Sequence, residues 1–106
     1  MTAMAATTVT STARVVTDAA ARYATQLAAH LGRKATVEAG PDGDRVMLGA
    51  GSCLLRVEPG ALTLEAVAAD EAALVRVQQV VGDHLERFGR RAGITVHWAA
   101  GPSQPR

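Results

Sequence analysis

The longest regular pattern of apolar positions runs from Asp70 to Arg91 and predicts an amphipathic helix. At about 100° per residue, one arc collects Leu74, Val77, Val81, Leu85 and Phe88, and the opposite side collects Arg76, Gln79, Asp83, Glu86, Arg87 and Arg90. His84 is the exception, because it lies about 20° from Val77, inside the apolar arc. It is therefore either a histidine at the edge of the core or part of a site.

A second amphipathic helix is predicted to follow Thr17 and Asp18, whose side-chain oxygens suit a helix N-terminus, and to extend to about Leu31. Its apolar positions repeat at helical spacing, at Ala20, Tyr23, Ala24, Leu27, Ala28 and Leu31. Gly32 stands where a left-handed C-cap is expected. His30 lies close to the apolar face, so both helices carry a histidine near their buried side.

The remaining pattern predicts strands. We expect them at residues 9–16, 35–39, 44–48, 53–58, 62–67 and 94–98, with reversals at 40–43, 49–52 and 59–60. Consecutive strands with such short turns pair antiparallel. Alternation places Cys53, Leu55 and Val57 on the face toward the helices, and Leu54 and Val67 on the opposite face.

The order β-α-β-β-β-β-α-β predicts an α+β fold. Two amphipathic helices and strands with one apolar face bury most simply as a two-layer sandwich, with a mainly antiparallel sheet and both helices on one of its faces. We expect one domain over residues 9–98, with a flexible N-terminus at 1–8 and a flexible C-terminal tail at 99–106.

Composition narrows the function classes. The chain has 106 residues, a formal charge of +1 and three aromatic side chains, Tyr23, Phe88 and Trp98, so nucleic-acid binding by charge or base stacking is not expected. The single Cys53 cannot form an internal disulfide. Without a signal-like N-terminus or an apolar run of about eighteen residues, we expect a cytoplasmic protein with no membrane contact.

Candidate chemistry is sparse. His30, Cys53, His84 and His97 are potential metal ligands, but no CxxC or HExxH spacing is present, so we predict no metal site and no cofactor. The Cys53 thiol could act as a nucleophile beside a histidine, although its position in the alternation favours a core residue. Turn and cap roles explain Gly49 with Gly51 and the acidic pairs 42/44 and 70/71.

Four segments resemble a family of short bacterial proteins of unknown function, found in actinobacteria and proteobacteria. They are ARVVTDAAARYATQLAAHLGRK, Gly51-Ser52-Cys53, EPGALTLEAVAADEAAL and VVGDHLERFGRRAGITVHW, and together they span Ala13 to Trp98. Family members often have His-Phe-x-His-Lys where this chain has His30-Leu31-Gly32-Arg33-Lys34. The second histidine of that motif is Arg33 here, which argues against an essential metal or haem site made of two histidines.

The resemblance implies a context, because similar domains occur beside or fused to siderophore-interacting flavoproteins and iron-uptake genes. No flavin or nicotinamide pattern is present, so we expect a non-enzymatic binding or accessory domain whose partner is a siderophore-related small molecule or a flavoprotein. The ligand-binding candidates are His30, Lys34, Cys53, His84 and Arg87. Two alternatives stay open: a homodimeric interaction domain that covers Leu54 and Val67, and a small enzyme that uses Cys53 or a histidine.

Overall fold

The computed structural model describes residues 8–49 and 51–101. The elements are β1 (Val9–Val16), α1 (Ala20–Leu31), β2 (Thr36–Gly40), β3 (Gly43–Met47), β4 (Gly51–Glu58), β5 (Ala61–Ala68), α2 (Glu71–Phe88), a 3-10 helix (Arg90–Ala92) and β6 (Ala99–Ala100). The predicted order of helices and strands is confirmed.

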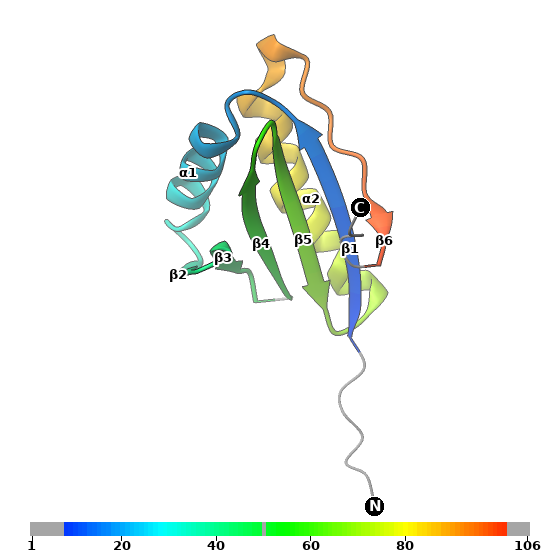
Figure 1. The fold of residues 1–106 in the computed structure, drawn as a ribbon. Coiled ribbons are helices and arrows are strands. Elements are labelled where there is room, and N and C mark those ends of the chain that lie inside the picture. Colours follow the sequence, from blue (N-terminus) through cyan, green and yellow to red (C-terminus); the bar gives the residue numbers. More distant parts are fainter. Residues whose placement is uncertain (1–7, 50, 102–106) are drawn as a thin grey trace, which may run out of the picture.

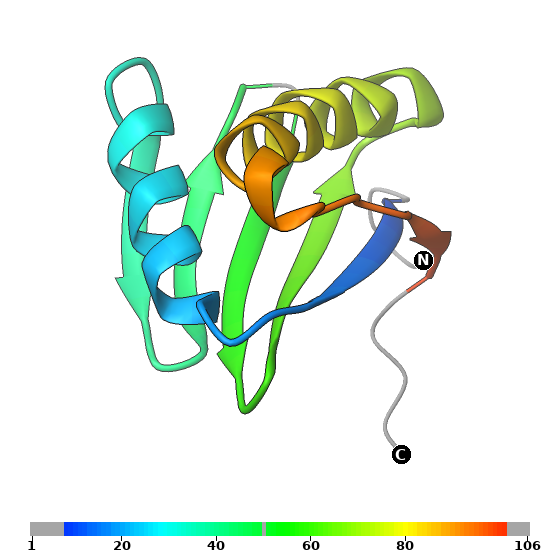
Figure 2. The ribbon, with the colours of Figure 1, turned by 90° about the horizontal axis from the view of Figure 1, so that it is seen from above.

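The strands form one antiparallel sheet in the order β2-β3-β4-β5-β1-β6. The four strands between the helices make the expected meander, and β1 adds to β5 (Figure 1). Both helices lie on the same side of the sheet (Figure 2), where α1 contacts β3, β4 and β5 and α2 contacts β1, β4 and β5. The predicted two-layer α+β sandwich is therefore correct.

The core lies between the helices and the inner face of the sheet. The apolar stripes of the helices contribute Tyr23, Leu27, Leu31, Leu74, Val77, Val81 and Leu85, and the strands contribute Val46, Cys53, Leu55, Leu62 and Leu64. Cys53 is 0% exposed. Its expected position facing the helices is confirmed.

The helix ends agree with the sequence only in part. Asp70 caps α2 as expected, since its carboxylate accepts a hydrogen bond from the Ala73 N–H at 2.8 Å. The cap predicted for α1 is wrong: Ala19 is the N-cap, and the Thr17 hydroxyl accepts from the Ala19 N–H in the preceding turn. Gly32 is right-handed, with φ −64°, because the chain continues into a further turn instead of reversing.

The strand predicted at 94–98 is wrong. These residues form an extended segment without strand pairing, which we call the strap, and its Ile94, Val96 and Trp98 side chains pack on the core. The Glu86 carboxylate accepts a hydrogen bond from the Val96 N–H at 2.9 Å. Alternation alone predicted a strand here, because one face of the strap covers α2 as a strand face would cover a helix.

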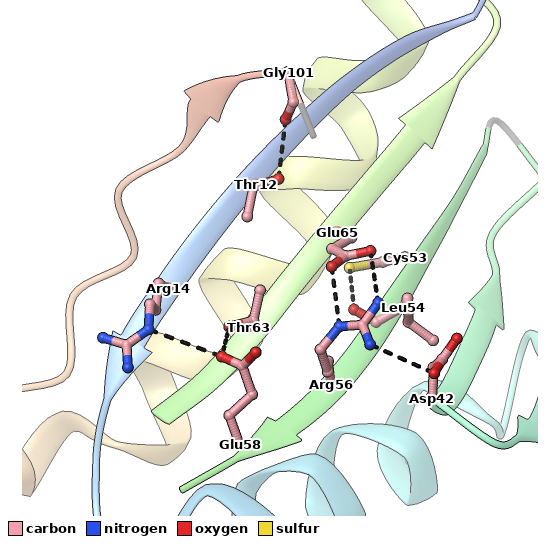
Figure 3. Close-up of polar contacts among 10 residues, drawn as sticks. All are labelled: Thr12, Arg14, Asp42, Cys53, Leu54, Arg56, Glu58, Thr63, Glu65 and Gly101. Carbon is pink, nitrogen blue, oxygen red and sulfur yellow. Dashed lines mark hydrogen bonds and ion pairs between the residues drawn. The ribbon is translucent and has the colours of Figure 1, made fainter. Parts of the chain in front are cut away.

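The sixth strand, β6, comes directly after the strap. Ala99 and Ala100 pair with Thr12 and Ser11 of β1, within the segment assigned by sequence to the tail. The Thr12 hydroxyl also donates a hydrogen bond to the Gly101 carbonyl at 2.9 Å (Figure 3).

Another boundary differs from the prediction as well, since β4 begins at Gly51, inside the predicted reversal at 49–52. Residues 1–7 and 102–106 of the predicted flexible ends lie outside the described residues.

The outer face of the sheet carries a polar network instead of helices. The Arg56 guanidinium donates to both carboxylate oxygens of Glu65 and lies 3.6 Å from Asp42, and Glu58 accepts from Thr63 (Figure 3). Leu54 points to this face, as predicted, but it is only 5% exposed between its cross-strand neighbours Arg45 and Glu65. Leu54 therefore needs no second copy of the chain to cover it.

Candidate functional site

A pocket of about 710 Å³ opens where the end of α1, the base of the β2–β3 hairpin and the middle of α2 meet. Its described lining combines apolar, cationic and histidine side chains: His30, Leu31, Arg33, Lys34, Ala35, Thr36, Met47, Leu48, Gly49, Val80 and His84. No acidic side chain is among these described residues. The pocket therefore offers an apolar wall and a positively charged rim.

His84 reaches the pocket from α2 and is half-buried. Its Nδ1 lies 2.6 Å from the carbonyl oxygen of Val80, one helical turn earlier. A carbonyl oxygen can only accept a hydrogen bond, so Nδ1 is the protonated nitrogen. In the neutral ring the other nitrogen, Nε2, then keeps a free lone pair with which to accept a hydrogen bond or a proton.

His30 reaches the same pocket from the last turn of α1 and is also half-buried. Its ring centroid lies 4.7 Å from that of His84 and 5.6 Å from that of Phe88, which it meets edge to face. Helical phase places both histidines at the margin of the apolar faces. The packing of α1 against α2 then brings the two rings together.

The electrostatic environment of His30 is positive. Arg33 and Lys34 lie in the turn after α1, where the Lys34 N–H donates to the Leu31 carbonyl and holds this turn against the helix end. Burial lowers the pKa of His30 below its ordinary value of 6.5, and the nearby His84, Arg33, Arg87 and Lys34 lower it further. These surroundings therefore disfavour a proton on His30.

The structure does not bring the other two candidates into this pocket. Arg87 is exposed on α2 and lines a neighbouring hollow of about 520 Å³ with Asp83, Glu86 and Arg90, although it is near enough to influence His30. Cys53 lies in the core, where burial raises the pKa of its thiol to about 12. A buried thiol that stays protonated is unsuited to nucleophilic attack or ligand contact.

Sequence reasoning missed the part of the pocket that comes from the hairpin. Met47, Leu48 and Gly49 line it at the end of β3, and Val80 lines it from α2. An exposed Met47 in a predicted strand was a signal, but only the sheet order places that strand end beside His30. Arg33 had appeared only as a departure from a family motif.

Within residues 8–49 and 51–101, no group of three or more His, Cys, Asp or Glu side chains is placed to hold a metal ion. None of the helices in that part of the chain has the length and apolar character needed to cross a membrane.

Comparisons with known proteins agree with this architecture. The NMR structure of PA4090 from Pseudomonas aeruginosa is 32% identical in sequence, with a TM-score of 0.69, and the match covers 92% of this chain and 99% of that one. The comparison with curated proteins gives no match. Residues 12–99 match the model of a family described as uncharacterized protein conserved in bacteria (DUF2218). The chain therefore belongs to this family of uncharacterized bacterial proteins.

Proposed function

We propose that this chain is a binding domain for a small organic anion. The binding site in this proposal is the pocket that His30 and His84 line, which we call the histidine pocket. The observation that supports this most is the convergence of His30, His84, Arg33 and Lys34 on one pocket with no carboxylate among its described lining residues. In a pocket of about 710 Å³, these groups can hold a negative charge while Leu31, Leu48 and Val80 contact an apolar body.

A binding role fits the histidines better than a structural one. A histidine needed only by the fold is commonly enclosed and satisfied by hydrogen bonds. Here both rings are half-buried, and within residues 8–49 and 51–101 the hydrogen bond of His84 is made by Nδ1, to Val80, and none by Nε2. The cations of Arg33 and Lys34 supply hydrogen-bond donors to an anionic group, and the Nε2 of His84 becomes a further donor once it is protonated.

Ferric siderophores are one class of ligand worth including in a test. Catecholate and carboxylate siderophores are organic anions, and the family resemblance of the sequence implies an iron-uptake context. The positive rim formed by Arg33 and Lys34 would attract such complexes at a distance. The pocket chemistry itself requires only negative charge and an apolar portion.

Thermal unfolding in the presence of a panel of compounds tests the proposal. The panel contains salicylate, octanoate, inorganic phosphate and ferric catecholate and hydroxamate complexes, with salicylamide as the neutral match of salicylate. A compound present at about ten times its Kd raises the melting temperature by about 6 °C in a domain of this size. We expect salicylate or octanoate to stabilise the protein and salicylamide to do so less.

Charge variants then locate the site. Arg33→Ala and Lys34→Ala should each weaken anion binding about two- to fivefold, because exposed ion pairs contribute little individually. Arg22→Ala is the matched control, since Arg22 lies in the first turn of α1, beside Tyr23, and lines a different hollow. Equal losses in Arg22→Ala and Lys34→Ala would contradict the assignment, and so would a panel in which no anion binds.

A further inference from the structure

The two histidine rings of the pocket are too close to carry positive charge independently. Their centroids are 4.7 Å apart, so a proton on one ring repels a proton on the other. Arg87 on α2 and Arg33 and Lys34 after α1 add further positive charge around His30.

No other described segment of the lining offsets this charge. Residues 35–36 and 47–49, which complete the wall, are Ala, Thr, Met, Leu and Gly and carry no titratable side chain. The nearest acidic residues of α2, Asp83 and Glu86, line the neighbouring hollow together with Arg87 and Arg90. Glu86 is also engaged by the Val96 N–H. The described groups around the histidine pair therefore carry an excess of positive charge.

An organic anion in the pocket reverses that balance, because its negative charge favours the protonated form of an adjacent imidazole. We propose, on the basis of the proposed anion-binding function, that the pocket takes up a proton from solvent together with its organic anion and that the His30–His84 pair holds this proton. The carboxylate enters ionised, the proton adds to a free ring nitrogen, and no covalent bond to the ligand is made or broken.

Linkage gives the sign of the pH dependence. If the bound anion raises the proton affinity of the pair, then protonation raises the affinity for the anion by the same factor. Binding therefore tightens as the pH falls through the range in which the pocket takes up its proton. One coupled proton changes Kd by at most about tenfold per pH unit.

Isothermal titration calorimetry with salicylate measures this coupling directly, because its carboxylate stays ionised throughout the range, and octanoate, which is largely ionised there, provides a second anion. Titrations at about pH 6.5 in Bis-Tris and in imidazole, two cationic buffers of different ionisation enthalpy, give the number of protons taken up. We expect about 0.3 to 1 proton per anion, and a Kd about five- to tenfold smaller at pH 5.5 than at pH 7.5.

Glutamine variants identify the proton acceptor. His30→Gln and His84→Gln remove a titratable ring and retain a polar side chain, so each should reduce the proton uptake and flatten the pH dependence of Kd. His97→Gln is the matched control, because His97 is exposed and lies 3.2 Å from Thr95 in the strap, outside the pocket lining. It should leave the coupling unchanged.

The outcomes separate this inference from the function on which it rests. Tight binding with no proton uptake and a Kd independent of pH would overturn the proton coupling and leave anion binding intact. Proton uptake that persists in both His30→Gln and His84→Gln would also overturn it. If neither salicylate nor octanoate binds at any pH, both the coupling and the proposed function are refuted.

Discussion

Replacing His84 by leucine distinguishes a ring that serves the fold from one that serves the pocket. The variant loses the hydrogen bond to Val80, about 0.5–1.5 kcal/mol, and the ring contact with His30, about 0.5–1 kcal/mol. It gains about 0.3–0.5 kcal/mol of helix propensity and about 1 kcal/mol from a half-buried apolar side chain. The net change in the free energy of unfolding should stay within about 1 kcal/mol.

Leu85 is the matched comparison on the same helix, because it is adjacent to His84 and 0% exposed. Leu85→Ala removes buried methyl groups and leaves a cavity, so it should cost about 3 kcal/mol. For 106 residues the entropy of unfolding is about 0.22 kcal/mol per degree. The expected loss of melting temperature is thus about 14 °C for Leu85→Ala and under about 5 °C for His84→Leu.

Thermal and urea unfolding followed by circular dichroism measure the two free energies, and calorimetry with salicylate measures binding. His84→Leu should keep its stability and show a flatter pH dependence of Kd. If it lost as much stability as Leu85→Ala, His84 would be a structural histidine, and the interpretation of the pocket would fail.

Three further outcomes follow from the described geometry. The folded-state pKa of His30 is below 6.5, so the unfolded chain binds the His30 proton more tightly and stability is lost as the pH falls below 6.5. His30→Gln should therefore show a smaller fall in melting temperature than the unmodified chain between about pH 7.5 and 5.5. An equal fall in both proteins would refute the assignment of this loss to His30. Cys53, with a pKa of about 12 and no exposure, should react with Ellman's reagent only after denaturation, and rapid reaction of the native protein would contradict its burial. Gly43→Ala should destabilise the protein more than Gly49→Ala does, by about 1–3 kcal/mol in urea unfolding. Both glycines have positive φ, but only at Gly43 would a Cβ atom lie 2.2 Å from the Leu55 carbonyl oxygen. Equal effects of the two substitutions would argue against this close contact between Gly43 and Leu55.

Periodicity predicted the layers of this fold because burial requires it. The apolar arc of the second helix, which includes Leu85, is removed from water only when that arc faces the sheet. In the same way, the alternation along the strand removes its apolar side chains from water only when Cys53 faces the helices. Chain ends and caps were less predictable, since they depend on local geometry. Gly32 can adopt a left-handed conformation, but the chain after α1 continues in a right-handed turn that brings Lys34 to the pocket.

The strap shows where alternation is insufficient. Ile94, Val96 and Trp98 alternate as a strand would, yet their partner is the helix surface and not a neighbouring strand. Gly82 leaves room for Val96 and Trp98 on α2, because a Cβ atom there would lie 3.3 Å from the Trp98 Nε1 and 3.8 Å from Val96. To distinguish a paired strand from a segment that packs on a helix, one must know which edge of the sheet is free.

The pocket could be predicted only in part. Helical phase selected His30 and His84 as polar residues at an apolar margin, and both line the pocket. Phase could not show that the rings meet, since that depends on how α1 and α2 pack over the sheet. Met47 and Leu48 were not predicted, because they reach the site through the sheet order.

The most direct measurement of the central claim is an NMR titration of the ¹⁵N-labelled protein with salicylate. If salicylate binds in this pocket, the chemical-shift changes should be confined to the amides around it, at His30, Arg33 to Thr36, Met47 to Gly49, Val80 and His84. The ring signals of the histidine pair should also move toward their protonated positions. Changes centred on the outer face of the sheet around Arg56 and Glu65, or no changes at millimolar salicylate, would contradict it.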